Sequence, residues 1–210
     1  MALQFVPFSS RDHAEQSLNN EIRRCVTTGN GSHASLSPFV VMLPGGATPK
    51  RVYDRIVQSP PTSIHPQLHV MLSDDRYVPV SSPDSNYHTI APALDAIGLP
   101  EDRRVRVHTD GTIDQATERF ASDLTRLSEA RATFSVAVLG IGGDGHTAGL
   151  FDSASIQLEA GTGSPWTTHQ VGPDGLERVT ATAPFILKFK RILFFATGES
   201  KRQILYDLSR

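Results

Sequence analysis

The chain has 210 residues, 20 basic and 22 acidic side chains, a formal net charge of −2 and 39% hydrophobic residues. This composition is typical of a globular protein with one full core, and it gives no general attraction to nucleic acid or to an anionic membrane. The longest apolar runs are too short to span a bilayer, and the N-terminus does not resemble a signal peptide. With one cysteine, Cys25, no internal disulfide forms. We therefore expect one domain over residues 1–210, located in the cytoplasm.

Apolar runs bounded by Gly, Pro or Asp predict five strands, and the stretches between them predict four helices. In chain order these are helix Arg11–Thr28, strand Phe39–Leu43, helix Pro49–Val57, strand Leu68–Leu72, helix Ser85–Ile97, strand Arg104–Val107, helix Ile113–Ala130, strand Phe134–Leu139 and strand Arg191–Thr197. Most of the strands are continuously apolar, as expected when both faces are covered. The alternation predicts an α/β fold, a single Rossmann-like domain with a largely parallel sheet flanked by helices.

Two local expectations accompany this fold. Thr48 is expected to be the N-cap of the second helix, with Pro49 at the first helical position. The polar, Gly-rich stretch Glu159–Gly175 is expected to be a loop on one side of the domain. Ligands of such sheets bind beyond the carboxyl ends of the strands, so the loops that follow the strands are the candidate site.

The first of these loops, LPGGATPK, contains Gly45 and Gly46 directly before a predicted helix. Glycines there bare main-chain N–H groups at a helix N-terminus, an arrangement that attracts phosphate. The alternative is a simple strand-to-helix turn. In the second loop, SDDRYVP, Asp74, Asp75 and Arg76 could form either a solvated turn or a pocket for a polar substrate. Neighbouring residues on an extended chain point to opposite sides, so Asp74 and Asp75 should differ in role.

The loop LGIGGDGHTAG has the G-x-G-x-x-G spacing of a dinucleotide-binding turn, in Gly140, Gly142 and Gly145. Asp144 would repel a pyrophosphate held in such a turn. A histidine beside a carboxylate is instead a natural general base, which makes His146 and Asp144 catalytic candidates. The other possibility is a surface Asp-Gly turn with a passing histidine.

Two cations complete the candidates, Arg178 in LERVTATAP and Lys201 in TGESK. Lys201 lies at the start of the last helix, where a cation opposes the helix dipole and a bound anion would compensate it. Neither residue has an obvious acidic partner in the sequence. No metal-binding spacing such as H-E-x-x-H is present, so we expect no metal and no cofactor.

Taken together, these loops resemble the family of 6-phosphogluconolactonases and glucosamine-6-phosphate deaminases. The likeness runs from about Phe39 onward, through LPGGATPKRVYDRI, LSDDRYVPVSSPDSNY, VAVLGIGGDGHTAGLF, RVTATAPFI and ATGESKRQIL. The positions that match the family's sugar-phosphate site are Gly45, Gly46, Thr48, Arg178 and Lys201.

The resemblance also implies roles for the remaining candidates. Arg76 matches a substrate-binding arginine, His146 the general base with Asp144 beside it, and Asp74 the acid that serves as base in the deaminases. Gly142 lies in the turn whose N–H groups would bind the substrate's developing oxyanion. The implied reaction is hydrolysis of 6-phosphoglucono-1,5-lactone to 6-phosphogluconate, in the pentose phosphate pathway.

Two features depart from the family pattern. The deaminases carry a Glu five residues after the loop histidine, where this chain has Phe151, which favours the lactonases. The family usually continues with a further strand and helix, so we expect this chain to be short at the C-terminus. The rival functions are an amino-sugar phosphate isomerase–deaminase, a non-catalytic sugar-phosphate sensor and, more distantly, a nicotinamide-dependent oxidoreductase.

Overall fold

The computed structural model of the chain describes residues 4–28, 37–151 and 166–209. Its central sheet consists of β1 (Phe39–Leu43), β2 (Leu68–Leu72), β4 (Arg104–Val105), β5 (Thr133–Gly140) and β8 (Arg191–Phe195). All neighbouring strands pair in parallel, in the order β4-β2-β1-β5-β8. This is the strand order of a Rossmann-like sheet. From β1 the chain adds β2 and β4 on one side and then returns to add β5 and β8 on the other, so the strand order reverses between β1 and β5. The predicted fold is confirmed, although the third predicted strand is two residues long.

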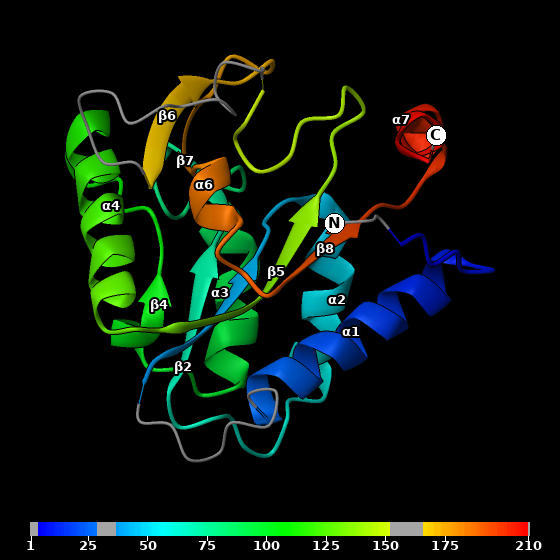
Figure 1. Ribbon diagram of the computed structural model, residues 1–210, viewed down its shortest axis with the longest axis horizontal. Coiled ribbons are helices and arrows are strands. Elements are labelled where there is room, and N and C mark those ends of the chain that lie inside the picture. The colour runs from blue at the N-terminus through cyan, green and yellow to red at the C-terminus, as the bar shows by residue number, and fades with distance from the viewer. Residues whose placement is uncertain (1–3, 29–36, 152–165, 210) are drawn as a thin grey trace.

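Helices cover both faces of this sheet (Figure 1). They are α1 (Arg11–Thr28), α2 (Ala47–Gln58), α3 (Asn86–Ala96), α4 (Ile113–Glu129) and the short α6 (Ala183–Ile186). Helices α1, α2 and α3 pack on one face, and α4 and α6 on the other. Successive side chains of a strand point to opposite faces. In β1, Val41 therefore packs in the core beneath α1, α2 and α3, whereas Val40 and Met42 pack in the core beneath α4 and α6. Burial on both faces explains why these strands are continuously apolar.

A second, smaller sheet was not predicted. It is antiparallel, with β3 (Asp74–Arg76), β7 (Glu177–Ala181) and β6 (Thr167–Val171) in the order β3-β7-β6. The loop predicted over Glu159–Gly175 is therefore wrong where β6 forms, while residues 159–165 lie outside the described residues. Strand β6 is polar and alternates in burial, as in a sheet with one solvated face, so it has no apolar run to reveal it.

The start of α2 also differs from the prediction. The helix begins at Ala47 with Gly46 as its N-cap, so Thr48 and Pro49 both lie in the first turn. The φ of Gly46 is 85°, a left-handed conformation that favours glycine. No side chain accepts a hydrogen bond at this cap, which leaves the first N–H groups of α2 open.

The chain leaves the sheet at β8 and forms a 3₁₀ turn, η3 (Glu199–Lys201), followed by α7 (Arg202–Leu208). Helix α7 lies beyond the carboxyl end of β8 and contributes no buried residue (Figure 1). Another 3₁₀ turn of the same length, η2 (Glu101–Arg103), precedes β4. Within the described ranges, no helix has both the length and the apolarity needed to cross a membrane.

Candidate active site

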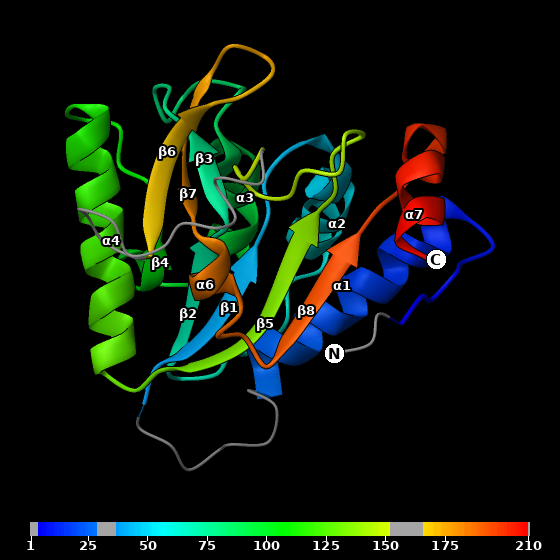
Figure 2. The same ribbon diagram turned by 45° about the horizontal axis from the view of Figure 1, so that its top comes forward.

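The candidate residues gather at the point where the strand order reverses. The loop after β1 contains Gly45 and Gly46, and the loop after β5 contains Asp144 and His146; these two strands are neighbours in the sheet. The small sheet lies beyond the same carboxyl ends (Figure 2). A crevice outside such a reversal point is where Rossmann-like folds bind their ligands.

The loop after β5 holds an imidazole–carboxylate pair. Nδ1 of His146 lies 2.5 Å from Oδ1 of Asp144, and the His146 N–H also donates to that oxygen at 3.2 Å. A Cβ at Gly142 would lie 2.2 Å from Nδ1 of His146, so only glycine leaves room for the pair. The main-chain N–H of Gly142 donates to the carbonyl of His146 at 2.7 Å and is thus already engaged.

This geometry orients the histidine for proton transfer. The carboxylate accepts the Nδ1–H, which leaves the lone pair on Nε2, and Nε2 has no hydrogen-bond partner among the described residues. Partial burial acts to raise the pKa of Asp144, but the hydrogen bonds from His146 outweigh it and lower the pKa below its ordinary value. An ionised Asp144 would also stabilise an imidazolium at His146.

The dinucleotide-binding interpretation of this loop does not fit its structure. A dinucleotide turn leads directly into a helix whose N-terminus faces the pyrophosphate. Here Gly145 is followed by a turn and an isolated bridge between Thr147 and Leu150, with no helix through Phe151. The loop closes on itself through main-chain hydrogen bonds and presents His146 instead.

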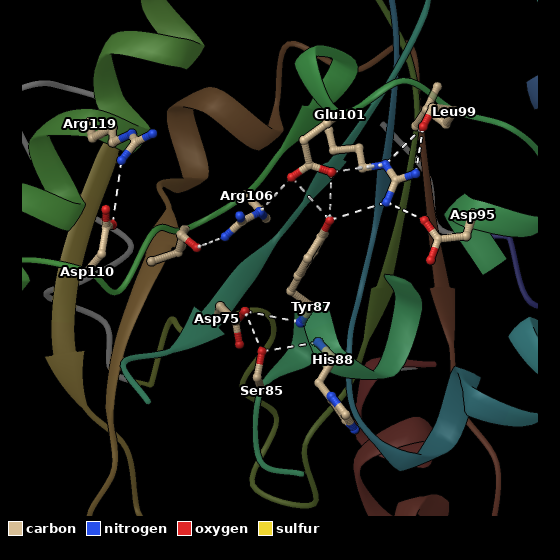
Figure 3. A network of polar contacts seen from close by, with 12 residues as sticks. Asp75, Ser85, Tyr87, His88, Asp95, Leu99, Glu101, Arg106, Asp110 and Arg119 are labelled. Atoms are coloured by element: carbon tan, nitrogen blue, oxygen red, sulfur yellow. Dashed lines mark hydrogen bonds and ion pairs between the residues drawn. The ribbon is translucent and has the colours of Figure 1, made fainter. Parts of the chain in front are cut away.

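Asp74 and Asp75 have different roles, as their alternation on β3 predicts. The Asp75 carboxylate accepts the main-chain N–H groups of Arg76, Asn86 and Tyr87 and the hydroxyl of Ser85. It therefore caps the N-terminus of α3 from the neighbouring strand (Figure 3). Burial raises the pKa of Asp75 to about 6, against these hydrogen bonds.

Asp74 faces the candidate site. It accepts the hydroxyl of Ser73 at 2.7 Å and the side-chain amide of Asn86 at 3.2 Å. Burial raises the pKa of Asp74, while the Ser73 hydrogen bond and the charges of Arg76 and Arg178 oppose the rise. The two arginines lie opposite each other on β3 and β7.

Arg178 has an acidic partner, so the expectation that it lacks one is wrong. Its guanidinium forms a two-pronged ion pair with Asp174, at 2.7 and 2.6 Å. The β6–β7 hairpin turn brings the two together, and a Cβ at Gly172 would lie 1.9 Å from Nη1 of Arg178. An acid four residues before the arginine, within a Gly-Pro-Asp-Gly turn, is the signal that identifies this pair once β6 and β7 are recognised as a hairpin.

Phe151 lies between this arginine and the loop after β5. Its ring centroid lies 4.8 Å from that of His146 and 5.1 Å from the guanidinium carbon of Arg178. These are contacts of an aromatic stack and of a cation–π pair. The position that carries a Glu in the deaminases thus holds an apolar ring, which contacts both the His146 imidazole and the Arg178 guanidinium.

The remaining candidates are placed less directly. The open N–H groups at Gly46 and the first turn of α2, which includes Thr48, face no side-chain acceptor. Lys201, in η3, follows Ser200, whose carbonyl would lie 3.8 Å from a Cβ at Gly143 in the loop after β5. In the part of the chain that the structure describes, the side chains of Thr48 and Lys201 form no hydrogen bond or ion pair. No group of three His, Cys, Asp or Glu side chains that could hold a metal occurs there either.

The ion pair between Asp174 and Arg178 makes a prediction about stability. The Arg178 hydrogen bonds hold the pKa of Asp174 well below its ordinary value, so the pair stabilises the fold above the unfolded pKa of about 3.9 and loses this effect as pH falls further. Asp174→Asn should lower the unfolding free energy by about 1 kcal/mol at pH 7, a value kept small because Asp174 is 44% exposed. Urea unfolding measures this difference in unfolding free energy between the variant and the wild type, and the difference should become smaller below pH 4. An equal difference at pH 3 and pH 7 would contradict an ionic origin of the stabilisation.

The sequence and the fold both have known relatives. The family described as glucosamine-6-phosphate isomerases/6-phosphogluconolactonase matches residues 9–210. A 6-phosphogluconolactonase of Haemophilus influenzae is 30% identical over 215 aligned positions, covering 98% of this chain and 85% of the relative. One from Synechocystis is 32% identical over 196 positions, covering 88% and 77%.

Among solved structures, a 6-phosphogluconolactonase from Thermotoga maritima superposes with a TM-score of 0.76 at 24% identity, covering 96% of this chain and 86% of that chain. The structural likeness supports the fold, and the sequence match over most of the chain supports the family. The chain belongs to the glucosamine-6-phosphate isomerase/6-phosphogluconolactonase family.

Proposed function

We propose that this protein hydrolyses 6-phosphoglucono-1,5-lactone to 6-phosphogluconate, as an enzyme of the pentose phosphate pathway. The observation that carries the proposal is the pair of His146 and Asp144 at the reversal point of the sheet, in a chain whose relatives are named for this reaction. An imidazole with a free Nε2 and a carboxylate on Nδ1 is equipped to activate water.

The reaction proceeds in two proton transfers. Nε2 of His146 takes a proton from water as the water oxygen attacks the lactone carbonyl carbon. The tetrahedral oxyanion then collapses, the bond to the ring oxygen breaks, and the imidazolium returns its proton to that oxygen. The product is the open-chain acid, which ionises at neutral pH.

The oxyanion needs a hydrogen-bond donor, and the main-chain N–H groups of the loop after β5 are the candidates. The N–H group of Gly142 is engaged by His146, whereas that of Gly143 has no partner among the described residues. We therefore assign the oxyanion to Gly143 rather than Gly142. Asp74 and Arg76, on β3, would bind the sugar's polar groups.

The phosphate would bind at the open N-terminus of α2, at Gly46 and Thr48, with Lys201 supplying charge. Arg178 is less available for phosphate binding than the sequence suggests, because its Nη1 and Nη2 already donate to Asp174. Its Nε and remaining N–H groups are the part that could reach a substrate oxygen.

The isomerase–deaminase reaction is the second candidate, because the same family performs it. Phe151 disfavours that reaction, since its ring packs directly against His146 where a carboxylate would be required. A non-catalytic sensor would bind the sugar phosphate without turnover.

The deciding experiment gives the purified protein freshly made 6-phosphogluconolactone and follows acid release directly. Hydrolysis well above the spontaneous rate supports the proposal. Ammonia release from glucosamine 6-phosphate would favour the deaminase, and binding of 6-phosphogluconate with no turnover of either substrate would favour the sensor.

Chelation provides a separate prediction. General-base hydrolysis by His146 requires no Lewis acid, so dialysis against a strong chelator should leave kcat and KM for the lactone unchanged. The measurement is the initial rate before and after dialysis. A loss that zinc or magnesium restores would contradict the mechanism.

A further inference from the structure

The side chain of Asn86 joins three segments of the candidate site. Asn86 is only 4% exposed, at the first position of α3. Its Nδ2 donates to the main-chain carbonyl of Asp74 at 3.0 Å and to the Asp74 carboxylate at 3.2 Å, and its Oδ1 accepts Nη1 of Arg76 at 2.7 Å. A Cβ at Gly45 would overlap its side chain at 2.1 Å, so the turn after β1 packs against it.

The chemistry of its neighbours fixes the orientation of this amide. Arginine only donates hydrogen bonds, whereas a carboxylate and a carbonyl only accept them. Oδ1 must therefore face Arg76 and Nδ2 must face Asp74. Neither an ionised Asp nor a Leu, both of similar size, supplies both a donor and an acceptor.

Asn86 also separates two groups of opposite charge. Asp74 and Arg76 are alternate residues of β3, so their side chains leave the strand on the same face. Within the described ranges no ion pair joins them; the Asn86 amide bonds both instead. This separation leaves the carboxylate and the guanidinium available to a ligand.

The contacts of Arg76 indicate which of its edges a ligand meets. Nη1 donates to Asn86 and to the carbonyl of Asp84 at 3.1 Å. The opposite edge carries Nε and Nη2, and neither has a partner among the described residues, although Nε is fully buried. That edge is one of the two with which arginine binds paired oxygens.

We propose that Asn86 is a positioning residue that holds Arg76 with its Nε–Nη2 edge toward the substrate and prevents Arg76 from pairing with Asp74. The inference rests on the proposed lactone hydrolysis, and it concerns the sugar's oxygen atoms rather than the proton transfer at His146. Its consequence is that loss of the Asn86 amide lets the guanidinium collapse onto the Asp74 carboxylate.

A structural role for the Asn86 side chain can be separated from this one, because other groups anchor the helix. The main-chain N–H groups of Asn86 and Tyr87 bond Asp75, Ser85 caps the helix, and the Tyr87 hydroxyl reaches Glu101 (Figure 3). Substitutions of the Asn86 side chain leave all of these contacts in place.

The test is a double-mutant cycle on lactone hydrolysis. Asn86→Ala should lower kcat/KM by about tenfold or more in the wild-type background, and by less than about twofold in the Arg76→Ala background, because Asn86 acts through Arg76. Full, additive losses in both backgrounds would overturn the proposal. So would a single variant that folds normally and keeps wild-type kcat/KM.

Asn86→Asp adds a readout that a structural role would not change. The new carboxyl still accepts from Arg76 but can donate to Asp74 only when protonated. Relative to wild type, kcat/KM should therefore fall by about tenfold at pH 8 and recover as pH decreases toward 6. A ratio to wild type that is constant across this range would contradict the assigned donor.

Asn19→Ala is the matched control. Asn19 is 5% exposed and accepts Nε of Arg23 at 3.3 Å, so it is a buried Asn–Arg contact of the same kind, on α1. Its loss should leave kcat/KM unchanged. If the wild-type protein itself hydrolyses no lactone, the proposed function fails; if it does and the Asn86 variants match it, only this inference fails.

Discussion

His146→Ala is expected to lower kcat for lactone hydrolysis by about a hundredfold or more, the usual scale for losing a general base. The imidazole is the group in the loop whose free nitrogen can accept a proton from water near neutral pH. KM should change little, because in the proposed complex other residues bind the phosphate and the sugar. Initial rates over a range of lactone concentrations, corrected for spontaneous hydrolysis, provide the measurement.

Two companion variants sharpen this result. Asp144→Asn keeps the size of the side chain but removes the charge that holds the Nδ1–H tautomer, so it should lower kcat as well. His169→Ala removes another histidine paired with an aspartate, since His169 Nε2 lies 3.2 Å from Asp114 on α4, and it should have no effect. A folded His146→Ala protein with near-normal kcat would exclude His146 as the base.

Lys201→Ala is expected to raise KM for the phosphorylated lactone by about ten- to a hundredfold. A charge-assisted hydrogen bond to phosphate contributes about 1.5–3 kcal/mol, and each 1.4 kcal/mol is about tenfold in affinity. The Lys201 ammonium makes no ion pair among the described residues, so a phosphate would be its main partner. If the phosphate also positions the carbonyl, kcat falls in parallel.

Unphosphorylated gluconolactone is the substrate control, because it has no phosphate for Lys201 to bind. Its slow hydrolysis should be nearly the same in Lys201→Ala and in wild type. Lys190→Ala is the matched variant: this exposed lysine directly precedes β8, at the end of the strand opposite to Lys201. Equal losses on both lactones would show that Lys201 supports the fold or the chemistry instead of the phosphate.

The sequence by itself determined the five strands of the central sheet and the four long helices that cover it, but not the short α6. Strands such as Phe39–Leu43 and Leu68–Leu72 are buried on both faces, so their apolar runs are local and unmistakable. The helix Arg11–Thr28 was likewise predicted to the residue. The carboxyl ends of parallel strands lie at one edge, so the loops with Gly46, Asp74 and His146 could be assigned to one region before their geometry was known.

Tertiary structure alone decided how these groups are paired. The polar strand β6 is stabilised by pairing with β7 and has no apolar run that would predict it. The hairpin then brings Asp174 to Arg178, and the approach of α3 to β3 brings Asn86 between Asp74 and Arg76. The left-handed Gly46 takes the cap expected of Thr48. The contacts of Arg178 and Asn86 depend on side-chain directions and distances across separate elements, which residue type and local spacing do not encode.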